Sequence, residues 1–184
     1  MDALPFTAQL INVFAAVLLL LSFAMLAQRR ILSLVDLLAW QGAALVGSTL
    51  AVAYSTGQQH LYYSAALTLA LKVILVPLVL HRLIRRLAVR WDTEPLLNIP
   101  ATMIVGLALV VFSFGLAQPI SALASTVTRS TLGIAIAVVM LSFLMMITRR
   151  KAISQVIGFL AMENGLFFAA TSATYGMPMV VELG

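Results

Sequence analysis

One stretch of the sequence decides the fold class: AISQVIGFLAMENGLFFAATSATY, residues 152–175. It is long enough to cross a bilayer as a helix, because a span needs about 20 mostly apolar residues. Further runs of this kind lie at 7–27, 31–54, 61–81, 99–119 and 131–148. The sequence therefore predicts an all-α, polytopic transmembrane helix bundle with six complete spans. The final MPMVVELG, residues 177–184, indicates the start of a seventh.

The composition leads to the same fold class. Of the 184 residues, 62% are hydrophobic and 9% are charged, whereas soluble domains carry roughly 25% charged residues. We therefore expect residues 1–184 to form a single integral-membrane domain. The N-terminal MDALPFTAQLINVF lacks the basic region of a cleaved signal peptide, so we expect no cleavage there.

Neither a metal site nor a cofactor site is predicted for this chain. It contains no cysteine, and His60 and His81 lie at opposite ends of the third run. Glycine-rich phosphate loops and nucleophile elbows are also missing from the sequence. We therefore expect no enzymatic activity from the chain by itself.

The basic residues explain the net charge of +5 and set the orientation. The first, third and fifth runs are followed by Arg29, Arg30, Arg82, Arg85, Arg86, Arg90, Arg149, Arg150 and Lys151. Alternating spans bring these residues to one side, which the positive-inside rule makes cytoplasmic. We therefore expect the N-terminus outside, the basic loops in the cytoplasm and no nucleic-acid partner.

Two similar segments predict an internal duplication. RRILSLVDLLAWQGAAL and RRKAISQVIGFLAMENGLF both open with an arginine pair and carry an amide residue followed by glycine, Gln41 in the first and Asn164 in the second. We expect parallel three-helix repeats at 1–86 and 131–184, joined by a reversing span at 99–119. The alternative is chance, since arginine pairs and glycines are common in membrane proteins.

The acid in the opening stretch is a candidate functional residue. Glu163 lies thirteen residues beyond Arg150, which is about 20 Å along a helix and past the middle of a core about 30 Å thick. A charged side chain at that depth costs at least about 2.5 kcal/mol, and protonation avoids much of this cost. We therefore predict that Glu163 carries protons. The structural alternative is a protonated glutamate that only hydrogen-bonds two helices together.

The two faces of this helix differ. Small residues form one stripe: Ser154, Gly158, Ala161, Gly165, Ala169 and Ser172. Such a stripe lets a neighbouring helix approach closely. Glu163 projects nearly opposite, among bulky apolar residues. Because lipid does not solvate a carboxylate, we expect this face to meet a second protein partner or a narrow hydrated passage.

Lys72, in LKVILVPLVLHRL, is the basic counterpart near the middle of the third run. Its depth makes it a second candidate for a proton path, and the alternative is a lysine paired with an acid of its own bundle purely for packing. Pro77 leaves the carbonyl of Val73 without its helical donor, so this carbonyl is a candidate partner. Four further polar residues complete the candidate set: Asp36, Gln41, Asn164 and Glu182. Asp36 equally fits the cytoplasmic interface.

These segments carry a family resemblance. LKVILVPLVLHRL, ISQVIGFLAMENGLFF and MPMVVELG together resemble the hydrogenase-4 component E family, membrane subunits of group 4 nickel–iron hydrogenase complexes that include formate hydrogenlyase types. The second half is also similar to the K subunit of respiratory complex I and the C subunit of Mrp-type cation/proton antiporters. The K subunit pattern IGLE places its carboxylate at the position of Leu160, and here the acid is Glu163, one helical turn on. These families continue into a complete last helix after the segment that ends here at Gly184, so we expect a truncated product or a chain without that span.

The resemblance implies a non-catalytic membrane subunit of a proton-translocating hydrogenase or complex I-like assembly in the bacterial cytoplasmic (inner) membrane. Glu163 and Lys72 would lie on its proton-transfer or charge-coupling path. The implied partners are antiporter-like and complex I H-like membrane subunits and a peripheral hydrogenase module, with all redox centres in partner subunits.

Two other functions stay open. One is a freestanding small secondary transporter that uses Lys72 and Glu163 as its binding pair, for which broken helices at the midplane would be expected. The other is an assembly subunit whose buried charges only specify packing.

Overall fold

The computed structural model describes residues 6–86, 98–121 and 126–174, and its regular elements there are all helices. In chain order they are α1 (Phe6–Ala27), α2 (Ile31–Thr56), α3 (Gln59–Thr68), the π-helix η1 (Leu69–Leu75), α4 (Val76–Arg86), α5 (Ile99–Ser121), α6 (Thr126–Thr148) and α7 (Ala152–Thr174). Because α3, η1 and α4 continue one another, the described residues contain six helices long and apolar enough to cross a membrane. The predicted all-α polytopic bundle is confirmed. The expected start of a seventh span, 177–184, lies outside the described residues.

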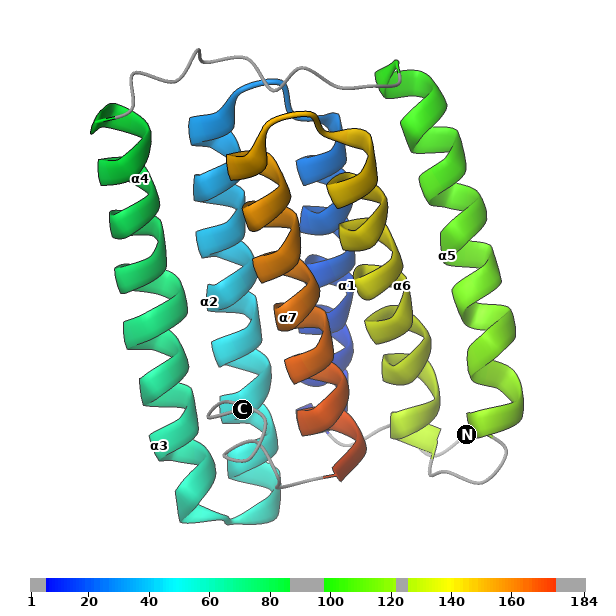
Figure 1. Ribbon diagram of the computed structural model, residues 1–184. Coiled ribbons are helices and arrows are strands. Elements are labelled where there is room, and N and C mark those ends of the chain that lie inside the picture. Colours follow the sequence, from blue (N-terminus) through cyan, green and yellow to red (C-terminus); the bar gives the residue numbers. More distant parts are fainter. Residues whose placement is uncertain (1–5, 87–97, 122–125, 175–184) are drawn as a thin grey trace.

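Four helices form the centre of the bundle. Helix α1 packs against α2 and α6, and α7 packs against the same two helices. The continuous rod α3–η1–α4 lies against α2, and α5 lies against α6, so these two elements form opposite edges of the bundle (Figure 1). Both α7 and the rod pack closely on α2 but make few contacts with each other. Helix α2 therefore lies between them and contacts both.

The interior consists of two apolar clusters. One includes Leu45 and Phe168, and the other, toward the basic end, includes Leu34 and Met145. Between the two clusters, three helices each contribute a buried polar residue: Ser22 from α1, Gln41 from α2 and Asn164 from α7. The bundle therefore has a polar layer near mid-span, with apolar packing on either side of it.

Small residues allow the close packing of α6 on α7. A Cβ atom added to Gly165 would lie 2.9 Å from Val138 Cγ1, and one added to Gly158 would lie 2.8 Å from Met146 Cγ. The predicted small-residue stripe of α7 therefore does face a neighbouring helix, and that helix is α6.

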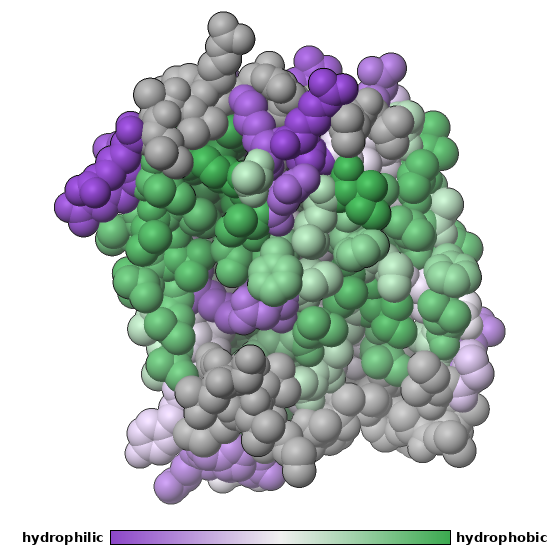
Figure 2. Space-filling view, viewed as in Figure 1, coloured by the Kyte–Doolittle hydropathy of each residue, from purple (hydrophilic) through white to green (hydrophobic). Residues whose placement is uncertain are grey.

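The basic residues that follow the first, third and fifth runs gather at one end of the bundle, as predicted. The α1–α2 connection, the end of α4 and the α6–α7 connection all lie at this end (Figure 1). Figure 2 shows hydrophilic groups concentrated there and a hydrophobic band below them, interrupted midway by one hydrophilic patch. Arg90 lies outside the described residues. The assignment of this end to the cytoplasm stays a prediction, as does the three-helix repeat, whose last helix would begin in 177–184.

The third span was predicted over 61–81, with Pro77 disturbing its helical hydrogen bonds, and the structure shows a longer span with a different helix type in its middle. It extends from Gln59 to Arg86, and its middle, Leu69–Leu75, is a π-helix. Pro77 has no N–H, and its ring would clash with the carbonyl four residues earlier in a regular α-helix. A widened turn relieves this clash, and the N–H of Val76 accordingly bonds to the carbonyl of Leu71, five residues back.

Candidate functional site at Lys72 and Glu163

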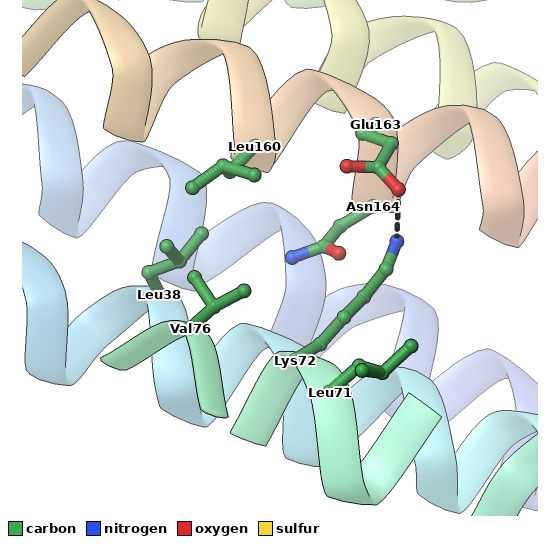
Figure 3. A pocket seen from close by; sticks show the side chains of 7 residues that line it. All are labelled: Leu38, Leu71, Lys72, Val76, Leu160, Glu163 and Asn164. Carbon is green, nitrogen blue, oxygen red and sulfur yellow. Dashed lines mark ion pairs between the residues drawn. The ribbon is translucent and has the colours of Figure 1, made fainter. Parts of the chain in front are cut away.

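The two ionisable residues expected at mid-membrane depth form an ion pair. Lys72 Nζ lies 2.9 Å from Glu163 Oε1. The lysine extends from η1 across to the carboxylate on α7, so the pair bridges two spans (Figure 3). The ion pair gives Glu163 an immediate partner in the same chain, and the expectation that its face meets a second protein or a narrow hydrated passage stays a prediction. The partner of Lys72 is therefore Glu163, rather than the carbonyl of Val73 that was the candidate.

The local backbone brings Lys72 to this position. It lies within the π-helix that Pro77 imposes, and a π-turn rotates the following side chains relative to a regular α-helix. Gly42 of α2 lies directly beneath, since a Cβ there would come within 3.3 Å of Val73 Cγ2 and 3.5 Å of Lys72 Cβ. Glycine thus lets η1 approach α2 closely while the lysine extends past it to α7.

The ion pair lies in a cleft with a volume of about 200 Å³. Its lining comes from α2, the rod and α7: Leu38, Leu71, Lys72, Val76, Leu160, Glu163 and Asn164 (Figure 3). The side chain of Lys72 is only 12% exposed, whereas that of Glu163 is 44% exposed. The ammonium group is therefore held inside the cleft, and the carboxylate is at its mouth on the surface of the bundle.

A second contact holds the lysine. Its Nζ lies 5.2 Å from the centroid of the Phe167 ring, one helical turn beyond Glu163. Phe167 is 1% exposed and belongs to the apolar cluster on that side of the polar layer. A cation over an aromatic face gains about 0.5–2 kcal/mol, the upper part of this range when desolvated. No sequence pattern indicated this contact, since Phe167 follows the spacing of an ordinary core residue.

A chain of hydrogen bonds leads from the cleft into the centre of the bundle. Asn164 Nδ2 donates to Gln41 Oε1 at 3.2 Å, and Gln41 Nε2 donates to Ser22 Oγ at 3.0 Å. The Ser22 hydroxyl donates in turn to the carbonyl of Leu18 at 2.9 Å. The amide residues of the two similar segments thus meet each other directly, and the chain crosses α7, α2 and α1 at one depth.

The cleft contains polar atoms that have no hydrogen-bond partner among the described residues. Asn164 Oδ1 is buried without a donor, and Lys72 Nζ contacts the carboxylate ionically without a well-directed hydrogen bond. Buried polar groups are almost always hydrogen-bonded to protein or to water. A polar cleft of this size has room for several water molecules. The site is therefore suited to hold water beside a carboxylate and an amine.

The remaining candidate residues lie elsewhere. Asp36 Oδ1 is 3.6 Å from His81 Nε2, and its side chain is 65% exposed toward the basic end of the bundle. His81 Nδ1 lies 3.0 Å from the carbonyl of Pro77, which accepts its hydrogen bond. This pair joins α2 to α4 apart from the central ion pair. Glu182 lies outside the described residues. Within those residues, no group of three or more histidines, cysteines or acids is placed to bind a metal ion.

Comparisons with known proteins give one clear relative and a more distant group. The chain is 33% identical over 176 residues to the uncharacterized protein Rv0085 of Mycobacterium tuberculosis. This match covers 95% of this chain and 80% of the relative. It is 28% identical over 128 residues to hydrogenase-4 component E of Escherichia coli K12 and of Shigella flexneri. That match covers 69% of this chain and 58% of the component E proteins.

No protein-family model and no solved structure matches the chain. The expected resemblance to hydrogenase-4 component E is thus supported as a distant similarity over part of that protein's length. The similarity to the mycobacterial protein extends over nearly the whole chain and most of the relative. The chain therefore belongs to the same family as Rv0085 of Mycobacterium tuberculosis.

Proposed function

We propose that this chain is a non-catalytic membrane subunit of a hydrogenase-like complex, in which the Lys72–Glu163 pair lies on a path for proton transfer or charge coupling. The observation that carries this proposal is an ion pair at mid-span, in a cleft that connects to a chain of buried amides. The distant similarity to a protein named hydrogenase-4 component E supports the assignment to a hydrogenase complex.

The chemistry of the pair suits charge coupling. Protonation of Glu163 removes the negative charge that balances Lys72. Whether the carboxylate holds a proton and where the ammonium group lies therefore depend on each other. Within a low-dielectric surrounding, a charge arriving on a neighbouring subunit shifts this balance more strongly than it would in water. Water in the cleft would deliver the proton, with Asn164 as an additional hydrogen-bonding group on its wall.

The exposure of Glu163 supports membership in a larger assembly. Its side chain is 44% exposed at mid-span, flanked on α7 by the exposed apolar residues Phe159 and Leu166. Because intramembrane charges face protein or water rather than lipid, a neighbouring membrane subunit would cover this face. Antiporter-like and complex I H-like subunits would be the neighbours that cover this face. A peripheral hydrogenase module would carry the redox centres. We place the complex in the bacterial cytoplasmic membrane, with the basic end of the bundle inside.

The test compares Glu163→Gln with Asp36→Asn, a carboxylate of the same chain that is removed from the cleft. An affinity tag on this chain would recover the complex from native membranes, and copurifying subunits would be identified by mass spectrometry. Inverted membrane vesicles would then report proton uptake during hydrogen-linked electron transfer. We expect Glu163→Gln to leave assembly intact and to abolish or strongly reduce proton uptake, while Asp36→Asn retains it.

Other outcomes would select another function. Unchanged proton uptake in an intact Glu163→Gln complex would make the pair a packing device and the chain an assembly subunit. Recovery of the wild-type chain without any hydrogenase subunit would instead favour a freestanding transporter. The described spans give that function little support, because apart from the π-turn of η1 they pass through mid-span unbroken.

A further inference from the structure

The outward face of α4 combines two arginines with two apolar residues. Arg82 and Arg86, together with Val79 and Leu83, line an open cleft of about 360 Å³ at the basic end of the bundle. Their spacing of three and four residues puts all four on one side of the helix. The opposite side of α4 is turned inward, where Pro77, Leu80 and Ile84 are buried.

The two guanidinium groups are available for an external ligand. Both side chains are exposed, and neither forms an ion pair with a described residue. Within the part of the chain that the structure describes, no acidic residue lines the cleft. Arginine presents a planar set of N–H donors that matches phosphate oxygens, and it is less strongly hydrated than lysine. The charged part of the ligand is therefore expected to be a phosphate or phosphodiester anion.

The surface beside the cleft indicates which phosphate compound fits. The exposed apolar side chains continue from the cleft toward mid-span along the same rod: Leu83, Val79, Leu78, Leu75, Ile74 and Leu71. A free phosphate ion would gain nothing from such a surface. A phospholipid matches both parts, since its headgroup lies at the membrane interface and its chains run along the helix into the hydrocarbon region.

We propose that this face of α4 binds an anionic phospholipid, with its headgroup phosphate on Arg82 and Arg86 and its acyl chains along the apolar surface of the rod. The proposal is independent of the function proposed for Lys72 and Glu163. Each basic residue near an anionic headgroup contributes about 1 kcal/mol. At 1.4 kcal/mol per tenfold, removal of both charges should weaken binding roughly 30-fold.

The test measures lipid binding to the purified full chain by native mass spectrometry, with titration of phosphatidylglycerol and phosphatidylcholine. The variant is Arg82→Gln/Arg86→Gln, and the charge-matched control is Arg29→Gln/Arg85→Gln, which removes two exposed arginines from the same end but from outside the cleft. We expect phosphatidylglycerol to bind the wild type and the control within threefold of each other, and the variant roughly 30-fold more weakly. Phosphatidylcholine should bind all three weakly.

Several results would overturn the proposal. If both double variants lose the same lipid affinity, the effect comes from the general positive charge at this end. If both lipids bind equally, the site does not recognise an anionic headgroup. Displacement of the lipid by millimolar glycerol phosphate would mark a site for free phosphate compounds. In native membranes, a photoreactive residue in place of Leu83 should label lipid, and labelling of a protein instead would assign this face to a partner subunit. Should the glutamine variant misfold, Arg82→Lys/Arg86→Lys must retain the preference for phosphatidylglycerol.

Discussion

Replacement of Arg149 should destabilise the bundle far more than its position in a basic loop suggests. This residue directly follows α6, yet it is 2% exposed. Its Nη2 donates to the carbonyls of Leu26 at 2.8 Å and Gln28 at 2.9 Å, and lies 3.4 Å from that of Met25. The Leu26 carbonyl lies in the last turn of α1 and the Gln28 carbonyl just beyond it, where backbone carbonyls have no partner within the helix. The guanidinium thus caps α1 with positive charge, where the helix dipole favours it.

The geometry sets the magnitude. One Nη2 carries two hydrogens, so two of the three contacts count as full hydrogen bonds. Hydrogen bonds from a charged donor contribute about 1.5–3 kcal/mol each, so Arg149→Ala should cost roughly 3–6 kcal/mol. The cost of burying the guanidinium offsets part of this gain, and we therefore expect a loss near 3 kcal/mol. Arg149→Lys keeps the charge but not the planar set of donors, and should lose about half as much.

The assay is reversible unfolding of the purified chain in mixed micelles, with the free energy of unfolding compared among variants. Arg150→Ala is the matched control, because Arg150 is the next residue, carries the same charge and is exposed. Its loss should stay within about 0.5 kcal/mol, as for ordinary surface substitutions. If Arg149→Ala and Arg150→Ala differ by less than that amount, Arg149 does not stabilise the end of α1 measurably.

Three further predictions concern the packing around the site, and each is checked by the same unfolding measurement. Gly165→Ala should cost about 1–3 kcal/mol because its Cβ would lie 2.9 Å from a valine of α6, whereas Gly115→Ala, with nothing within 4 Å, should be neutral or slightly stabilising. Asn164→Leu should cost about 1–2 kcal/mol, because it leaves the buried Oε1 of Gln41 without its hydrogen-bond donor. A double-mutant cycle of Phe167→Leu with Lys72→Met should give a coupling free energy of about 0.5–2 kcal/mol. If the two losses of stability simply add, the cation–π contact contributes nothing.

Hydropathy and charge position were enough to predict the spans and the shared basic end. A bilayer imposes a length of about 20 apolar residues on each helix, and a pattern over that length is visible in one sequence. The small-residue stripe on α7 was predictable for the same reason, since helical periodicity fixes which residues share a face. Gly158 and Gly165 were therefore expected at a close helix contact, and the contact with α6 confirms this.

The pairing of Lys72 with Glu163 required information that periodicity does not contain. Each residue could be placed at mid-span depth from its distance to the nearest arginines, but which helices are neighbours depends on packing of the whole bundle. The π-turn added a further change, because Pro77 alters the direction of the side chains before it in a way that a regular helix does not reproduce. Arg149 was grouped with the other loop arginines, since its burial depends on where α1 ends.

The placement of the polar layer argues against packing as its only role. Two apolar clusters already join the helices on either side of it, so most of the interior packing lies outside Gln41, Asn164 and the ion pair. A buried ion pair is weak evidence for stability, because apolar residues of similar size usually stabilise a protein as well or better. With Glu163 at the mouth of the cleft, its attraction to Lys72 is also partly screened wherever water enters. A costly group in such a bundle supports our proposal that its charge takes part in proton transfer or charge coupling, so proton uptake, rather than stability, is the decisive measurement for Glu163→Gln.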